Sequence, residues 1–334
     1  MRSIRIFLIL ICLFEGRATM ATVGEGDTKV NRDEIAPRWS DDGNFIYFYS
    51  YRDKDPELVH KLPSVTMRMT SKGTDRKILS DRSSRNWWLA PAACTPENCG
   101  KTKLYLISER DAGEPFGGSN LYEFDQVTGQ YTALTEAAPE QGEWVLFPTR
   151  SANGQQLSYI RRASLRDRET SHLFILDLSS GDHREIPLPH TGIKEAVISP
   201  DGTSIFYSPN DHQIYRFDMK HRDLTLLVEF DENEGQILDG LSVRSDSGAL
   251  LFAYGPGNIS DTEIYMMDLA NSNLTQLTEN QVADLRPSWH PSSKKIIFNR
   301  IPSPERDWND IIVYDLESGA ESNLTGNASR VRPQ

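Results

Sequence analysis

Residues 37–52 read PRWSDDGNFIYFYSYR, and residues 286–300, near the other end of the chain, read RPSWHPSSKKIIFNR. The two stretches align without a gap and share a proline, a tryptophan, an isoleucine and a phenylalanine. These shared positions are Pro37 and Pro287, Trp39 and Trp289, Ile46 and Ile296, and Phe48 and Phe298. A phrase that recurs at both ends of a chain indicates a repeated structural unit.

Four weaker copies of the phrase lie between these two. They read KLYLISERD, PTRSANGQQLSY, KEAVISPDGTSIFY and SVRSDSGALLF, at residues 103–111, 148–159, 194–207 and 242–252. One apolar anchor recurs in all six copies at intervals of 45 to 58 residues: Ile46, Leu104, Leu157, Ile205, Leu250 and Ile296. The chain therefore holds six units of similar length.

A second shared piece follows the anchor in most units. It reads NLYEFD, LFILDL, QIYRFDM, EIYMMDL or IIVYDL, and a turn and a short strand come after it. Each piece ends near an aspartate, at Asp125, Asp177, Asp218, Asp268 and Asp315. Each unit thus contains four short strands separated by turn residues.

Four strands per unit at this period are typical of a β-propeller. The second strands, such as FIYFY and ALLFAY, are almost continuously apolar, as a sheet covered on both faces requires. We expect Trp39 and Trp289 to wedge between blades, and Pro37 and Pro287 to open their strands, where few ladder bonds are lost. The sequence predicts an all-β fold, a six-bladed β-propeller of four-stranded antiparallel blades over residues 22–334.

The phrase P-x-W-S-x-D-G, with IYMMDL (residues 264–269) and QLT (276–278), resembles the propeller repeats of the TolB family. TolB is the periplasmic component of the Tol–Pal envelope system, so the resemblance implies a β-propeller and a protein partner in the envelope. TolB also carries an α/β domain before its propeller, and only about a dozen residues separate the expected leader from the first blade here. The same repeat occurs in carbohydrate-active enzymes and in the propellers of prolyl-oligopeptidase-type hydrolases.

Residues 1–21 have the pattern of a secretory signal peptide. Arg2 and Arg5 precede the apolar run IFLILICLF. Small residues three and one positions before the cut give two candidate cleavage sites, after Ala18 and after Ala21. The run is too short to span a bilayer. We therefore expect a periplasmic or secreted protein with no membrane insertion in the mature form.

The net charge disfavours one class of binding partner, and the cysteine content bears on the cellular compartment. Without residues 1–21 the chain carries 33 basic and 47 acidic residues, a net charge of −14, which disfavours binding to nucleic acid. The two cysteines that remain, Cys94 and Cys99, lie in CTPENCG. In an oxidising compartment this close pair predicts a local disulfide, with two free thiols as the alternative.

No motif for catalysis or cofactor binding is present. The sequence lacks G-x-S-x-G, H-E-x-x-H, a P-loop and G-x-G-x-x-G. Its seven histidines show no paired ligand spacing, and the carboxylates of SDDGN (residues 40–44) are better explained by a turn than by a calcium loop. We expect no catalytic residues, no cofactor and no metal site.

Two loops between second and third strands carry residue types that anchor interfaces. The loop of the third unit, RRASLRDRETS, holds four arginines, and the loop of the sixth unit holds an arginine and a tryptophan. These candidate partner-binding residues are Arg161, Arg162, Arg166, Arg168, Arg306 and Trp308. The alternative is that they are solvated loop charges.

These features favour an exported, non-enzymatic propeller that binds one or more proteins of the cell envelope. The alternative is a carbohydrate-active or carbohydrate-binding propeller that resembles oligogalacturonate lyases. Bound metal, or carboxylates and histidines that converge at the channel mouth, would favour that alternative.

Overall fold

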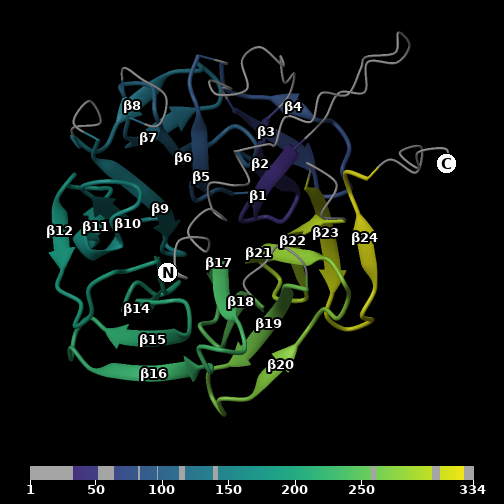
Figure 1. Cartoon of the computed structure of the whole chain (residues 1–334). Helices are drawn as coiled ribbons and strands as arrows, with labels where there is room; N and C mark the ends of the chain where they lie inside the picture. Colours follow the sequence, from purple (N-terminus) through teal and green to yellow (C-terminus); the bar gives the residue numbers. More distant parts are fainter. Residues whose placement is uncertain are drawn as a thin grey trace, which may run out of the picture.

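Six four-stranded antiparallel sheets surround a common axis, which confirms the six-bladed propeller (Figure 1). In this computed structural model each sheet is built from consecutive strands, and the six first strands contact one another in a ring about the axis. None of the described residues belongs to a helix long and apolar enough for a membrane crossing. The structure describes residues 33–51, 64–81, 83–95, 97–112, 117–137, 142–256, 261–302 and 309–326.

Blades one to three occupy the first half of the described chain. Their strands are β1 (Asp33–Trp39), β2 (Phe45–Tyr51), β3 (Val65–Thr70), β4 (Lys77–Ile78), β5 (Asn86–Pro91), β6 (Lys103–Ser108), β7 (Asn120–Asp125), β8 (Tyr131–Ala133), β9 (Trp144–Arg150), β10 (Gln156–Arg162), β11 (His172–Asp177) and β12 (His183–Ile186). A short 3-10 helix, η3 (Arg168–Thr170), interrupts the loop between β10 and β11.

Blades four to six complete the ring. Their strands are β13 (Glu195–Ile198), β14 (Ser204–Ser208), β15 (Gln213–Asp218), β16 (Leu224–Glu229), β17 (Gln236–Val243), β18 (Ala249–Gly255), β19 (Glu263–Asp268), β20 (Leu274–Gln276), β21 (Ala283–Trp289), β22 (Lys295–Ile301), β23 (Asp310–Asp315) and β24 (Glu321–Asn323). The signal peptide expected at residues 1–21 lies outside the described residues.

The core consists of the apolar runs of the first three strands, packed between neighbouring blades. Trp39 packs with Ile297 and Ile311 of blade six, and Trp289 packs with Leu251 and Ile264 of blade five. Both indoles are buried and wedge between blades, as the sequence predicts. Covering both faces of each sheet removes the apolar second strands from water, which is the main stabilising term of the fold.

The aspartates that end the third strands close the turn to the fourth strand. Asp125 Oδ1 accepts hydrogen bonds from the N–H groups of Val127 and Thr128, at 2.8 and 2.9 Å. Asp218 makes the same pair of bonds to the two backbone N–H groups that follow it by two and three residues. An aspartate recurs here because a short carboxylate can satisfy both donors of a tight turn.

The prolines of the shared phrase lie inside their strands and do not open them, so that expectation was wrong. Pro37 and Pro287 fall where the β1–β2 and β21–β22 registers shift, next to residues with left-handed backbone, Ala36 at φ 52° and Arg286 at φ 55°. A β-bulge leaves one residue unpaired, so a proline there costs no ladder bond. Five of the six described first strands carry such a shift, and β13 is the exception.

Hydrogen bonds between blades repeat around the ring. Ser64 and Ser119, each just before a third strand, donate from Oγ to the backbone carbonyls of Asn86 and Val145 in the next blade, at 2.6 and 2.8 Å. The ring closes between blades six and one without an exchanged strand among the described residues. There Asn299 is the buried side chain that accepts from the N–H of Ala36 at 2.8 Å.

Candidate binding site on the propeller axis

Four charged side chains from four different blades meet near the axis. They lie on the first strands β1, β13, β17 and β21. Figure 1 shows β1, β17 and β21 around the centre of the ring. We call these four residues the axial cluster: Arg38, Glu195, Asp239 and Arg286. Their strands are mostly buried, and two of them also carry other buried carboxylates, Glu34 in β1 and Asp284 in β21.

Glu195 holds the cluster to the bulge of the neighbouring blade. Its two carboxylate oxygens accept hydrogen bonds from the N–H groups of Gly240 and Leu241, at 2.8 and 3.2 Å. Gly240 has φ 121°, and a Cβ there would lie 2.4 Å from Cα of Arg286. Glycine at this position therefore permits the close approach of β17 and β21 that brings the charges together.

The charges interact across the axis as well as around it. Arg38 attracts Glu195, although blades one and four face each other across a six-membered ring. Nη2 of Arg286 lies 3.9 Å from Oδ2 of Asp239, an ion pair too long for a hydrogen bond. The cluster thus combines two guanidinium groups with two carboxylates in a site that is largely shielded from bulk water.

Burial raises the pKa of Glu195 to about 7, and the nearby Asp239 carboxylate acts in the same direction. The hydrogen bonds from Gly240 and Leu241 and the charge of Arg38 oppose that shift. Burial also lowers the pKa of Arg38. Side chains with shifted pKa values often lie at functional sites, so the converging charges of the axial cluster mark it as a candidate site.

The cluster retains unused hydrogen-bonding capacity. Oδ1 of Asp239 and both Nε and Nη1 of Arg286 are buried and make no hydrogen bond among the described residues. Such groups are costly to leave unpaired, at about 1–3 kcal/mol each. Water or a ligand that supplies both a donor and an acceptor would satisfy them.

The structure separates the four arginines expected in the blade-three loop. Arg161 is partly exposed and pairs with Glu143 at 2.6 Å, whereas Arg166 is exposed. Arg168 pairs with Asp211 at 3.1 Å. The four residues do not form one exposed patch.

Arg162 belongs to the interior and not to the loop surface. Its guanidinium donates to Oγ of Ser171 at 2.8 Å and to the carbonyls of Ile193 and Lys194 at 2.5 and 3.0 Å. Burial lowers its pKa to about 10. Arg162 therefore joins blades three and four, while the other two candidate residues, Arg306 and Trp308, lie outside the described residues.

Cys94 and Cys99 are joined by a disulfide, as the sequence predicts. The turn that they close does not stand free, because the N–H of Cys94 donates to Asp41 at 3.2 Å and the carbonyl of Gly100 accepts from Arg68. Among the described residues one group of potential metal ligands lies close together, Asp42 with the two cysteines. Its sulfurs are consumed by the disulfide, so they are not available as thiolate ligands.

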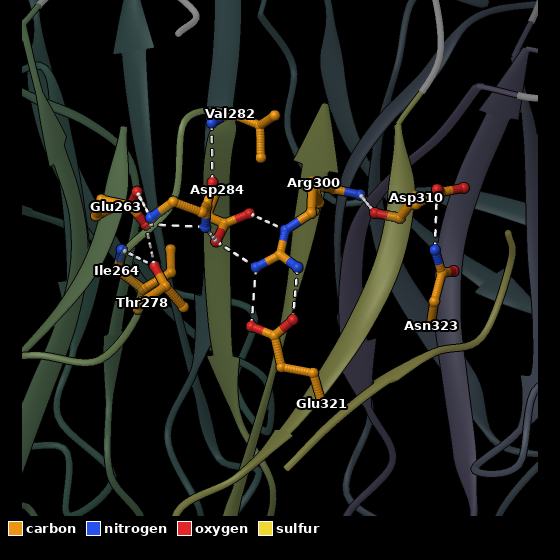
Figure 2. Close-up of polar contacts among 11 residues, drawn as sticks. Glu263, Ile264, Thr278, Val282, Asp284, Arg300, Asp310, Glu321 and Asn323 are labelled. Atoms are coloured by element: carbon orange, nitrogen blue, oxygen red, sulfur yellow. Dashed lines mark hydrogen bonds and ion pairs between the residues drawn. The ribbon is translucent and has the colours of Figure 1, made fainter. Parts of the chain in front are cut away.

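A second polar network joins blades five and six (Figure 2). The guanidinium of Arg300 lies between two carboxylates, with Nε 2.7 Å from Asp284 and Nη1 2.5 Å from Glu321. Asn280 links Asp284 to Glu263 through its Nδ2 atom, at 2.9 and 3.2 Å. Since these groups satisfy one another, the network fits a structural role better than ligand binding.

The axial cluster was not identified from the sequence. The signal was present as a charged residue inside each of four mostly buried first strands, as in LRPSW at residues 285–289. Alignment of the repeats shows this signal only in part. Glu195 and Arg286 share a column, ten residues before the apolar anchor, but carry opposite charges, and Arg38 and Asp239 occupy other columns. Only closure of the ring shows that the four positions face one axis.

No family model matches the chain. TolB from Acinetobacter baumannii is similar in structure, with a TM-score of 0.60 and 14% sequence identity over 84% of this chain and 75% of that one. A putative TolB from Agrobacterium tumefaciens gives a TM-score of 0.56 and 17% identity over 78% and 87% of the two chains. The chain therefore has a TolB-like β-propeller fold.

Two enzymes are also similar. An oligogalacturonate lyase in complex with manganese has a TM-score of 0.57 and 14% identity over 88% of this chain and 77% of the lyase. Among curated proteins, the uncharacterized peptidase YuxL of Bacillus subtilis (strain 168) is 21% identical over 201 residues, which are 60% of this chain and 28% of YuxL. The match thus spans little more than a quarter of that relative's length.

Proposed function

We propose that the protein is exported and acts as a non-enzymatic β-propeller that binds a partner protein in the cell envelope. The observation that carries the proposal is the axial cluster, in which charges from four blades meet beside unpaired hydrogen-bonding atoms. A rigid ring fixes these groups and the loops around them, which is how scaffolds usually present a binding surface.

Two further features support an envelope location. The disulfide of Cys94 and Cys99 fits an oxidising compartment, where such bonds persist. The pattern of residues 1–21 fits a cleaved export signal. Both agree with a protein that works outside the cytoplasm.

The chemistry of the described residues favours binding over catalysis. His183 and His190 are hydrogen-bonded to Tyr159 and Tyr207, and His290 bonds to Ser292, so these three imidazoles lie in separate local contacts. His290, which contacts the Ser292 hydroxyl at 2.8 Å, is oriented by the backbone of Gly43 and not by a carboxylate among its described contacts. A carbohydrate-active propeller is the alternative, because the guanidinium groups of the axial cluster could bind the carboxylates of an acidic sugar.

Affinity capture from cross-linked envelopes of the source organism tests the proposal. We expect the wild type to recover one envelope protein reproducibly, and Arg286→Asn to lose at least about tenfold in recovery, equivalent to about 1.4 kcal/mol. Asparagine is chosen because it tolerates the left-handed backbone at this position. Arg184→Ala, on the outer strand β12, is the control and should bind like the wild type.

A loop variant and an activity assay complete the test. Changing Arg161 and Arg166 together to alanine should also weaken capture, because we expect the partner to contact the loop face as well as the axis. Equal recovery by wild type and Arg286→Asn would refute an axial site. Turnover of polygalacturonate or of peptides by the purified protein would refute the non-enzymatic role and favour the alternative.

A further inference from the structure

The outer strand of blade four differs from the other outer strands in length. β16 has six residues, whereas β4, β8, β12, β20 and β24 have two to four. It is the last strand of its sheet, so one side of β16 has no partner strand in the described part of the chain. Proteins usually keep such edges short or charged, because a free edge can accept another strand.

The free side of β16 presents both backbone and apolar groups. The carbonyl of Asp223 accepts a hydrogen bond from the N–H of Asp218, so Asp223 and, by alternation, Thr225 direct their backbone groups toward β15. Leu224 and Leu226 therefore direct theirs outward, and this alternation ends at Leu226, where the β15–β16 register shifts. Their side chains are 37% and 43% exposed and lie on the same face of the sheet.

The two ends of β16 carry opposite charge. Lys220, Arg222 and Asp223 are exposed just before the strand and leave a net positive charge there, and Glu229, Asp231 and Glu232 are exposed at its end and beyond it. A second copy of this strand in the antiparallel direction would bring each basic end against an acidic end. A parallel copy would bring like charges together, which is unfavourable.

We propose that β16 is a self-association edge, which pairs antiparallel with β16 of a second copy of this chain. A two-fold axis at Thr225 places Leu224 of one copy opposite Leu226 of the other, and both residues offer outward backbone groups in this register. The pairing joins two four-stranded blades into one continuous sheet. Because the strand complements itself in charge and in register, a second copy of the chain fits the edge better than an unrelated segment.

The oligomeric state of the full chain tests this pairing. Light scattering during size-exclusion chromatography should show a concentration-dependent dimer for the wild type and a monomer for Leu226→Lys. The matched control is Leu274→Lys on β20, since Leu274 is also 43% exposed on an outer strand. It should dimerise like the wild type, and thermal unfolding should show that both variants fold.

A charge swap separates this pairing from any other contact. Changing Lys220 and Arg222 to glutamate should weaken the dimer at least tenfold, and adding Glu229→Lys with Glu232→Lys should restore it. Hydrogen exchange at the amides of Leu224 and Leu226 should slow in the dimer. A wild type that stays monomeric at every concentration, or a dimer that Leu226→Lys or the swap leaves unchanged, would overturn the proposal.

Discussion

Glu195 is the residue at which burial and charge compete most directly. The two N–H groups that it accepts from and the guanidinium of Arg38 favour its charged form, whereas burial and Asp239 favour the neutral form. Burial prevails and raises its pKa to about 7 from an ordinary value near 4.5. The carboxyl group therefore changes its charge within the pH range in which cells live.

This shift predicts a pH-dependent difference in stability between the wild type and Glu195→Gln. Because the folded state holds the proton more tightly than the unfolded state, Glu195 contributes its full stability below about pH 4.5 and loses it as the pH rises through 7. The wild type should lose a few kcal/mol relative to the variant over that range, at about 1.4 kcal/mol for each pKa unit. Urea unfolding at a series of pH values checks this, and a constant difference would show that Glu195 is not shifted.

The sequence predicted individual residues well where a role depends on near neighbours, and poorly where it depends on closure of the ring. The Cys94–Cys99 pair and the turn aspartates depend on a few adjacent residues, and the structure contains both. Arg162 was expected on a loop surface because the repeats place the stretch RRASLRDRETS between a second and a third strand. It is buried because blade four, which begins about 30 residues later, covers it.

At the scale of elements, a threonine after the fourth strand recurs in several blades and is hydrogen-bonded to the third strand of its own blade. We call this contact the threonine clasp. Oγ1 of Thr278 accepts from the N–H of Ile264 at 2.9 Å and donates to Glu263 at 2.6 Å (Figure 2). Thr135 makes the equivalent pair of bonds in blade two, and Thr325 makes it in blade six. The Leu-Thr pair that recurs at the end of the repeats is therefore explained by the hydrogen bonds of the threonine, and not only by the end of an outer strand.

Replacing this threonine by an isosteric apolar residue should destabilise the protein. Thr278→Val keeps the shape but leaves the buried Ile264 N–H without its acceptor and removes one of the two hydrogen bonds to Oε2 of Glu263, at an expected cost of about 2 kcal/mol in the free energy of unfolding. Thr275→Val, on the exposed part of β20, should change it by less than about 0.5 kcal/mol. Chemical denaturation of both variants measures the difference, and equal effects would argue against the clasp.

Most of the strand pattern was predictable because each element repeats six times. A single worn copy such as KLYLISERD would not identify a strand unit, but its alignment with FIYFYSYRD does. The bulges were not predicted, since a proline signals a strand opening as readily as a register shift. The docked disulfide turn could not be predicted either, because its contacts with Asp41 and Arg68 lie in another blade.

At the scale of the molecule, the ring closes through side chains and not through a shared sheet among the described residues. Asn299 of β22 accepts from the N–H of Ala36 and donates to the carbonyl of Glu34, both at 2.8 Å. Arg76 adds an ion pair to Glu34 and a hydrogen bond to the carbonyl of Leu324. Blades six and one are therefore joined by a few specific polar contacts over an apolar seam.

Loss of the Asn299 side chain should weaken the junction between blades six and one more than the junctions between the other blades. Asn299→Ala removes the hydrogen bonds to two buried backbone groups and should cost about 3 kcal/mol in the free energy of unfolding. Amide hydrogen exchange should accelerate in β1 and β21–β23 while blades three and four stay protected. Acceleration spread evenly over all blades would indicate that the closure is not a weak point.

The most direct test of the account is site-specific photo-cross-linking in intact cells, since its central claim is that a partner protein binds at the face and axis of the ring. A photo-reactive residue in place of Arg161, beside the loop between β10 and β11, should form an adduct with one envelope protein. The same group in place of Arg184, on the outer rim at β12, should not form that adduct. Absence of any adduct from position 161, or the same adduct from both positions, would contradict the claim.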